Sequence, residues 1–183
     1  MNTNKLKLNM TILSNENLKA MKDEEINILS KNFFLFSKAN LEEYSKWIFT
    51  YHDEFKAENI IGFMELKRYA ISEGATLSDK SPILFDIFKE EEYINYEDDN
   101  GFKSDRFSRL DTFILINNVE VLEKYRFQGI GSSIYKYLEE NILTSEDSVV
   151  ETTRTIQGRR CNLLFKIEKV PVFTDIVELY EGL

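Results

Sequence analysis

The sequence predicts an α/β fold in a single domain that spans residues 1–183. Three observations predict it: an opening segment of alternating apolar and polar residues, a long apolar segment from Thr112 to Leu122, and a glycine turn after it that leads into helical spacing. A strand, a tight turn and a helix in this order form the repeating unit of α/β domains. The chain is long enough for one substantial core and too short for two comfortable ones.

The composition excludes several classes of protein. Fourteen Phe and nine Tyr are far too many for a chain that cannot collapse, so we expect a folded domain. The formal net charge of -9 repels phosphate backbones and argues against nucleic acid as the partner. The sequence has no apolar stretch as long as a membrane span, no signal peptide, and a single cysteine, Cys161. These features predict a cytoplasmic protein with no membrane partner.

The N-terminal part of the sequence predicts one strand followed by a helix. Apolar and polar residues alternate over residues 5–12, which is typical of a half-buried strand. From about Asn15 to Phe33, apolar residues recur at the helical period instead.

A second helix is predicted to begin at Asn40. The side chain of Asn40 can cap a helix, and Glu43 stands three residues later in the capping-box position. Helical spacing continues beyond a break near Gly62, so we expect an enlarged N-terminal helical segment from about 15 to 73. The apolar stripe that predicts this helix consists of Tyr44, Trp47, Ile48, Tyr51 and Phe55.

The rest of the sequence predicts mainly strands around one helix. Residues 83–88 and 93–96 are short strand-like segments, and Thr112 to Leu122 is apolar along most of its length, which predicts a central strand. A helical period follows, with Ile134, Leu138 and Ile142 on one face. Residues 149–156 and 161–167 predict a hairpin, and Thr174 is expected to cap a last helix through Leu179.

The turn between the central strand and the helix has the composition of an anion-binding site. It reads R-F-Q-G-I-G from Arg126 to Gly131, and its two glycines let the backbone approach a ligand closely. Unpaired amides at the start of a helix favour negative charge, so we expect the turn to bind a phosphate or a diphosphate. A Walker loop would need a lysine after Gly131, where Ser132 stands. A dinucleotide-binding loop would need a third glycine where Ile134 stands.

This strand, turn and helix resemble the GNAT superfamily of acyl-coenzyme A-dependent N-acetyltransferases. The family signature R/Q-x-x-G-x-G/A matches Arg126 to Gly131, and the likeness extends over about Asp111 to Ile142. The resemblance implies a mixed, twisted sheet flanked by helices, with acetyl-CoA as co-substrate and its diphosphate wrapped by the turn. The residues it implies for cofactor binding are Val119, Val121, Arg126, Phe127, Gln128, Gly129, Ile130, Gly131 and Ser132.

The resemblance also implies catalytic residues. In the family, a tyrosine in a Leu-Tyr-Glu segment often protonates the departing thiolate, and Tyr180 stands in such a segment near the end of this sequence. A second register places Glu168 at the tyrosine position. In both registers, part of the family's usual C-terminal half is missing, so we expect a shortened C-terminal end. The position along the strands gives the candidates for the general base: Glu120 on the cofactor strand first, then Asp111 at its start and Glu151 on the next strand, with water as the alternative.

The predicted reaction is transfer of an acetyl group from acetyl-CoA to a primary amine of a small molecule or a peptide, by direct attack. The alternative is a catalytically impaired GNAT-fold binding protein that still binds coenzyme A. A further alternative is a domain whose glycines only form a turn. A shortened sheet would leave an exposed edge, which a second copy of the chain would cover in a homodimer. We expect no metal, because His52 is the only histidine and has no second ligand residue nearby.

Overall fold

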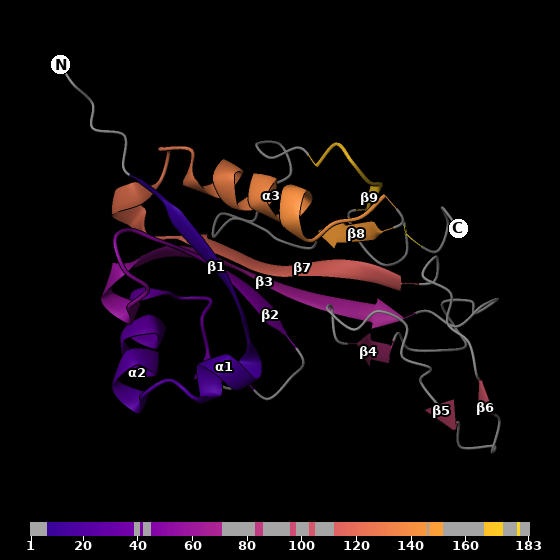
Figure 1. Cartoon of the computed structure of the whole chain (residues 1–183), viewed down its shortest axis with the longest axis horizontal. Helices are drawn as coiled ribbons and strands as arrows, with labels where there is room; N and C mark the ends of the chain where they lie inside the picture. Colours follow the sequence, from indigo (N-terminus) through magenta and orange to yellow (C-terminus); the bar gives the residue numbers. More distant parts are fainter. Residues whose placement is uncertain are drawn as a thin grey trace.

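A mixed sheet with helices on both faces forms the body of the molecule (Figure 1). The structure is a computed structural model that describes residues 7–38, 41, 45–70, 83–85, 96–97, 103–104, 112–145, 147–151, 167–173 and 179. The predicted α/β fold, with a mixed sheet flanked by helices, is confirmed.

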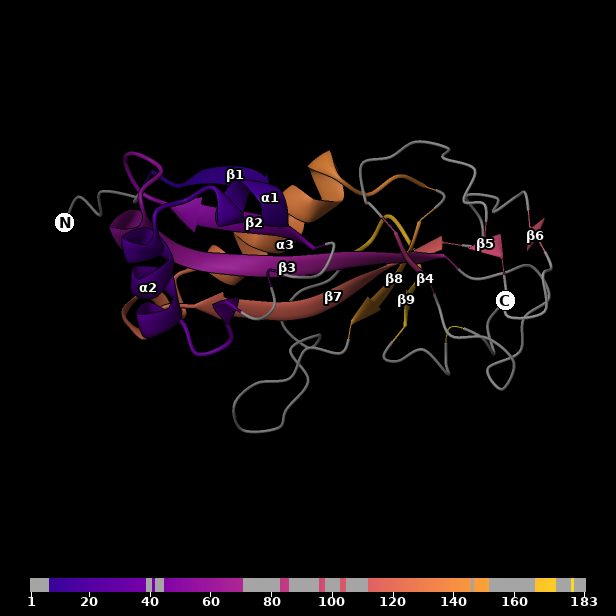
Figure 2. The ribbon, with the colours of Figure 1, turned by 90° about the horizontal axis from the view of Figure 1, so that it is seen from below.

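The main sheet has the strand order β1-β2-β3-β7-β8-β9, and β4 pairs with β3 beside this path. Neighbours from β1 to β7 are antiparallel, whereas β7, β8 and β9 are parallel. In Figure 2, β3 and β7 run side by side along most of the molecule. The strands are β1 (Asn9–Ser14), β2 (Lys46–Tyr51), β3 (Ile60–Ala70), β4 (Ile83–Phe85), β7 (Thr112–Val121), β8 (Ser148–Glu151) and β9 (Val172–Phe173).

Two groups of helices cover opposite faces of this sheet. The helices α1 (Asn15–Lys19) and α2 (Asp23–Asn32) lie on one face, and α3 (Ile130–Asn141) lies on the other (Figure 1). Parallel strands need a crossover connection, and α3 is the crossover from β7 to β8. Short 3-10 helices, η2 (Ala57–Asn59) and η4 (Glu123–Tyr125), precede β3 and the turn before α3.

The predicted opening strand and the helix after it are confirmed, with a break in the helix. Ser14 ends β1 and caps α1, because its hydroxyl accepts a hydrogen bond from the amide of Asn17 at 3.2 Å. The chain leaves the helix at Ala20 and begins α2 at Asp23, where acidic residues in the first turn suit the helix dipole.

The predicted second helix and the enlarged helical segment are wrong beyond α2. Residues 46–51 and 60–70 form β2 and β3, the two strands that follow β1 in the sheet. β2 is buried on both faces: Trp47 and Phe49 contact the α1/α2 side, and Ile48 contacts the α3 side. A strand buried on both faces is apolar at nearly every position, so its residues also fit a helical stripe. The capping residues proposed for that helix, Asn40 and Glu43, lie outside the described residues.

A glycine allows α3 to pack closely on the centre of the sheet. Gly62 in β3 pairs with Val121 in β7. A Cβ atom at Gly62 would lie 3.1 Å from the carbonyl oxygen of Glu120 and 3.4 Å from Cδ1 of Ile134 in α3. The side chain of Ile134 is fully buried here, so the start of α3 is fixed against the end of β7.

The structure also tests the predictions for the second half of the chain. The central strand is confirmed as β7, which pairs with β3 on one edge and with β8 on the other, and the helix after it is α3. The short strands at 83–88 and 93–96 appear in part, as β4 and as β5 (Tyr96–Glu97), which pairs with β6 (Lys103–Ser104). The predicted hairpin is described only over β8, and the last helix only at Leu179, so both stay predictions for the remaining residues.

Candidate functional site

The turn between β7 and α3 contains two residues in the left-handed conformation. Phe127 has a φ of 62° and Gly129 a φ of 79°. This conformation costs an L-residue with a side chain roughly 1–2 kcal/mol, which glycine avoids and Phe127 does not. Gly129 is the N-cap of α3, and a Cβ placed on it would meet no atom within 4 Å. The space in front of the helix start is therefore open.

The amides of this turn have no protein acceptor among the described residues. The amide of Arg126 donates to the carbonyl of Glu123 at 3.1 Å, and that of Ser133 donates to the carbonyl of Gly129 at 3.0 Å. Between them, the amides from Phe127 to Ser132 donate to no group in the part of the chain that the structure describes. Successive free amides at a helix N-terminus form a concave site for an anion.

Side chains of the turn hold its shape. Nε of Arg126 donates to the carbonyl of Val121 at 3.0 Å, and Nε2 of Gln128 donates to the carbonyl of Lys124 at 3.1 Å. Ile130 is buried against the sheet, and the Phe127 side chain is fully exposed. The predicted binding residues from Arg126 to Ser132 therefore lie together in one turn, with Arg126 anchoring the turn to the strand before it.

The strands β7 and β8 separate beside this turn. They are paired only from Phe113 to Ile116 of β7, opposite Ser148 to Glu151 of β8. β7 continues for the rest of its length with β3 as its partner, and among the described residues no strand pairs with its other edge there. One edge of β7 next to the turn is thus open within the described part of the chain.

The main chain of Val119 and Val121 faces this open edge. The amide of Leu122 donates to the carbonyl of Ile61 in β3 at 2.9 Å. Because main-chain groups alternate between the two edges of a strand, those of Val119 and Val121 face away from β3. The carbonyl of Val121 is bound by Arg126, which leaves the polar groups of Val119 and the amide of Val121 at the open edge. The structure therefore places main-chain groups of both valines at the edge of β7 that leads into the turn, and their cofactor role stays a prediction.

A bulge in β7 lies where the two strands separate. Glu65 of β3 pairs with Asn118 and Leu66 pairs with Ile116, so Asn117 is an extra residue in β7. The extra residue changes the alternation of side chains: Ile116 and Val119, three residues apart, both contact the α3 side. Asn117 and Asn118 both extend to the opposite face instead, where their Nδ2 atoms lie 2.8 Å and 2.5 Å from Oε2 of Glu65.

Sequence reasoning missed this cluster of polar side chains around Glu65. The carboxylate of Glu65 is fully buried, and it also accepts a hydrogen bond from the hydroxyl of Ser45 at 3.1 Å. Two adjacent asparagines in the middle of an apolar strand are the signal that could have predicted a bulge, because they break the alternation of the strand.

The candidates for the general base have different surroundings. The carboxylate of Glu120 accepts hydrogen bonds from the amides of Phe34 at 3.0 Å and Leu35 at 2.7 Å, and so holds the chain after α2 against β7. Glu151, the last residue of β8, is buried and accepts a hydrogen bond from the hydroxyl of Tyr135. Burial raises the pKa of Glu151, and the Tyr135 hydrogen bond lowers it by less. Asp111 lies outside the described residues.

We predict that Glu120→Gln separates the two roles that Glu120 can have. A general base contributes about 10²–10⁴-fold to the rate, so its loss would lower kcat by that factor with little change in thermal stability. The two amide hydrogen bonds predict the other outcome: a lower unfolding midpoint with kcat within about threefold of wild type, because an amide oxygen replaces only one carboxylate oxygen. Steady-state kinetics and thermal unfolding of the same preparation distinguish them. A fall in kcat of a hundredfold or more would assign the base to Glu120.

The predicted general acid, Tyr180, lies outside the described residues, but its neighbour Leu179 is described. Leu179 is 1% exposed and packs with Phe113 of β7 and Val150 of β8. The residue before Tyr180 is therefore held on the paired part of β7 and β8. Whether the hydroxyl of Tyr180 reaches a thioester stays a prediction.

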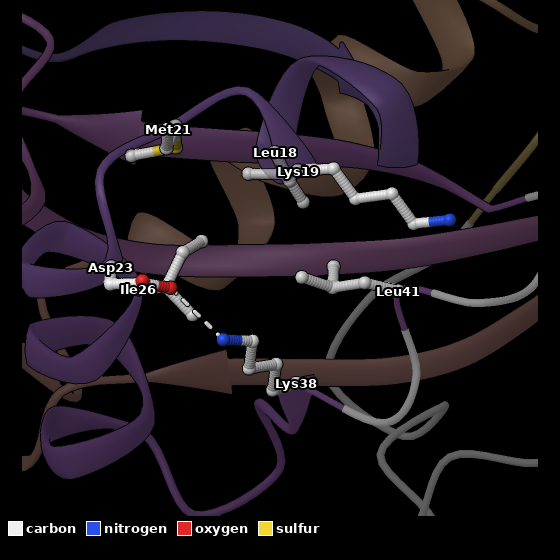
Figure 3. A pocket seen from close by; sticks show the side chains of 7 residues that line it. All are labelled: Leu18, Lys19, Met21, Asp23, Ile26, Lys38 and Leu41. Atoms are coloured by element: carbon white, nitrogen blue, oxygen red, sulfur yellow. Dashed lines mark hydrogen bonds and ion pairs between the residues drawn. The ribbon is translucent and has the colours of Figure 1, made fainter.

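Two cavities are lined by residues other than those of the turn. One, of about 220 Å³, opens between α1, α2 and the chain near Leu41, and has the buried Leu18 and Ile26 in its lining. Figure 3 shows the ammonium of Lys38 directed at the carboxylate of Asp23 at the same cavity, at 3.0 Å. This cavity lies on the α1/α2 face of the sheet, to which the side chain of Glu120 also extends.

The second cavity, of about 410 Å³, borders the turn, because Tyr125 lines it one residue before Arg126. His52 also lines it, with Nδ1 3.0 Å from Oδ2 of Asp53. Within the described residues, no group of three or more His, Cys, Asp or Glu side chains is arranged to hold a metal ion. No helix in the same part of the chain has the length and apolar character needed to cross a bilayer.

Comparison with known proteins identifies no family for this chain. No protein-family model matches it, and no curated protein does. A solved structure similar to it is the xEco2 acetyltransferase domain bound to a CoA conjugate. The sequence identity is 13%, the match covers 81% of each chain, and the TM-score is 0.36. A likeness of this level establishes neither a ligand nor a reaction for this chain.

Proposed function

We propose that this chain is a GNAT-type N-acetyltransferase, which moves an acetyl group from acetyl-CoA to a primary amine by direct attack. The observation that carries the proposal is the run of amides from Phe127 to Ser132 that have no acceptor among the described residues, beside an edge of β7 that no described strand covers. Amide donors at a helix start, next to a strand edge with no partner in the described part of the chain, suit the two halves of coenzyme A. The diphosphate needs donors, and the pantetheine arm carries amide groups that can pair with a strand.

In this proposal, the chain's main-chain groups do most of the binding. The amides from Phe127 to Ser132 bind the diphosphate, and the positive end of the α3 dipole adds to their attraction. Val119 and Val121 pair with the pantetheine arm, which places the thioester near the bulge at Asn117. Arg126 binds the carbonyl of Val121 and so keeps the turn and the strand edge in register.

The proposed chemistry is a single displacement through a tetrahedral intermediate. The amine nitrogen attacks the thioester carbonyl carbon, and the new C–N bond forms as the carbonyl oxygen takes up negative charge. Collapse of the intermediate breaks the C–S bond, and the amine proton leaves to a base or to water. The sulfur departs as a thiolate and takes a proton from Tyr180. The products are an N-acetylated amine and free coenzyme A.

Calorimetry and a thiol-release assay test the proposal together. We expect acetyl-CoA to bind one site per chain and to raise the thermal unfolding midpoint, because a ligand specific for the folded state stabilises it. We also expect thiol release that depends on an added amine from a panel of small amines and lysine peptides. Binding without release across the panel favours a catalytically impaired binding protein. Absence of both binding and thermal stabilisation contradicts the proposal.

Replacing Tyr180 by phenylalanine is predicted to slow turnover about 10²–10⁴-fold, because the departing thiolate then lacks its proton donor. The affinity for acetyl-CoA is expected to stay within about twofold, since the variant removes only the hydroxyl. Presteady-state thiol release gives the first quantity and calorimetry the second. An unchanged rate would remove Tyr180 from the mechanism and leave the cofactor site unaffected. Phe173→Leu alters the packing around Leu179, the neighbour of Tyr180 in the sequence, and serves as a control with no expected effect on the proton step.

A further inference from the structure

We propose that Glu65 is a positioning residue for the coenzyme, because its buried carboxylate holds the bulge that keeps β7 open for the pantetheine arm. The inference rests on the proposed function, which gives the open edge of β7 its ligand. It assigns a role to a carboxylate that has none in the mechanism above. The residues that carry it are Glu65, Asn117 and Asn118, which come from two neighbouring strands.

The side chain of Glu65 is fully buried, with a hydrogen-bond partner for each carboxylate oxygen. Oε1 accepts a hydrogen bond from Ser45 at 3.1 Å, and Oε2 accepts hydrogen bonds from both asparagines. Nζ of Lys67 lies 4.0 Å from Oε1. A carboxylate taken out of water is tolerated only with such partners. Two of those partners are the adjacent residues that form the bulge.

The shared acceptor determines where the side chains of β7 point. In a regular strand, Asn117 and Asn118 would extend to opposite faces, and one of them would face the apolar α3 side. Oε2 of Glu65 binds both amides on the same face, which is possible only with the extra residue in β7. The bulge then turns Val119 and Val121 toward α3.

The position of the bulge connects this cluster to the open edge. Pairing between β7 and β8 ends at Ile116, immediately before Asn117. A bulge bends and twists its strand locally, and here it does so at the residue where β7 leaves β8. Without the Glu65 anchor, β7 can return to a regular register, which reverses the faces of Val119 and Val121 and moves their main-chain groups to the other edge.

The experiment compares two ligands that use different parts of the site. Acetyl-CoA uses the diphosphate turn and the strand edge, whereas 3′-phosphoadenosine 5′-diphosphate, its nucleotide part, uses the turn alone. Affinities of both ligands are measured by calorimetry for wild type, Glu65→Gln, Asn117→Ala and Asn118→Ala. We expect each variant to bind acetyl-CoA about tenfold more weakly, which is the loss of one or two good hydrogen bonds to the arm. We expect the affinity for the nucleotide part to change by less than about twofold.

Two further variants make the comparison specific. Asn15→Ala removes a different buried hydrogen bond on the same face, the one that Nε1 of Trp47 donates to Oδ1 of Asn15 at 2.6 Å. We expect Asn15→Ala to lower the unfolding midpoint without changing either affinity. That result would show that a loss of stability alone does not weaken binding of the pantetheine arm. The double variant E65Q/N118D exchanges donor and acceptor, since the new amide can donate to the new carboxylate. We expect it to recover at least half of the loss in acetyl-CoA affinity, on a logarithmic scale.

Each outcome has a defined meaning. Equal weakening of both ligands, or no weakening of either, overturns the role of Glu65 and leaves the proposed function standing. The same conclusion follows if acetyl-CoA binds wild type no more tightly than the nucleotide part does. Failure of wild type to bind either ligand contradicts the proposed function, and with it this inference. If Glu65→Gln does not fold, the two asparagine variants decide the matter, because they leave the carboxylate with two of its three hydrogen-bond donors.

Discussion

Replacement of Gly129 by glutamate is expected to weaken acetyl-CoA binding more than 100-fold and to abolish turnover. The new side chain enters the open space in front of α3, where a Cβ meets no atom within 4 Å, and its charge opposes that of the diphosphate. The φ of 79° at this position also strains any L-residue by roughly 1–2 kcal/mol. We therefore expect the free energy of unfolding to fall by that amount, with the protein still folded. Calorimetry with acetyl-CoA measures the first effect, and thermal unfolding the second.

Gly129→Gln is the matched control for this variant. Glutamine has nearly the same size as glutamate and imposes the same backbone strain, so the difference between the two variants isolates the charge. We expect the glutamine variant to bind at least tenfold more tightly than the glutamate variant, because its side-chain amide does not repel the diphosphate. Equal affinities in both variants and wild type would place the anion elsewhere.

Among the variants proposed for this protein, Asp147→Ala is expected to lower the free energy of unfolding the most. Oδ1 of Asp147 lies 2.9 Å from Nη2 of Arg68, and the two side chains are 1% and 6% exposed. Oδ2 accepts hydrogen bonds from the amide and the hydroxyl of Thr144. Asp147→Ala leaves the Arg68 charge buried without this partner, which typically costs about 3–5 kcal/mol. In a domain of this size, that corresponds to a fall of roughly 6–20 °C in the unfolding midpoint.

The exposed pair of Lys38 and Asp23 gives the control for Asp147. Its N–O distance is similar, at 3.0 Å, but its side chains are 67% and 85% exposed. Because water screens such a pair, Asp23→Ala is expected to change the free energy of unfolding by less than about 1 kcal/mol. Arg68 belongs to β3, and Asp147 directly precedes β8. Similar shifts of the unfolding midpoint in Asp147→Ala and Asp23→Ala would show that the buried pair does not stabilise this connection.

Local pattern predicted β1, α1, α2, β7 and α3, because β1 and the helices each follow one period and β7 is apolar along most of its length. β7 is apolar and central, and α3 presents one apolar face to the sheet. β2 and β3 were missed because both are interior strands with both faces covered, so their side chains follow no period of two. Buried polar residues in β3, such as Glu65 and Arg68, made its sequence look like a partly exposed helix.

The candidate site also has one part that could be predicted from local sequence and one part that could not. The turn from Arg126 to Ser132 could be predicted because glycine spacing and a following helix start are local features of the sequence. The cluster of Glu65 with Asn117 and Asn118 could not, because it depends on the register between β3 and β7, which are about fifty residues apart in the chain. For the same reason, the contacts of Glu120 with the chain after α2 have no local signal.

A crystal structure with bound acetyl-CoA tests the central claim most directly. We predict density for the diphosphate at the start of α3, with its oxygens about 2.7–3.2 Å from amide nitrogens between Phe127 and Ser132. The pantetheine arm should then follow the edge of β7 at Val119 and Val121. A diphosphate bound at any other place, with these amides left in water or bonded within the protein, would contradict the account.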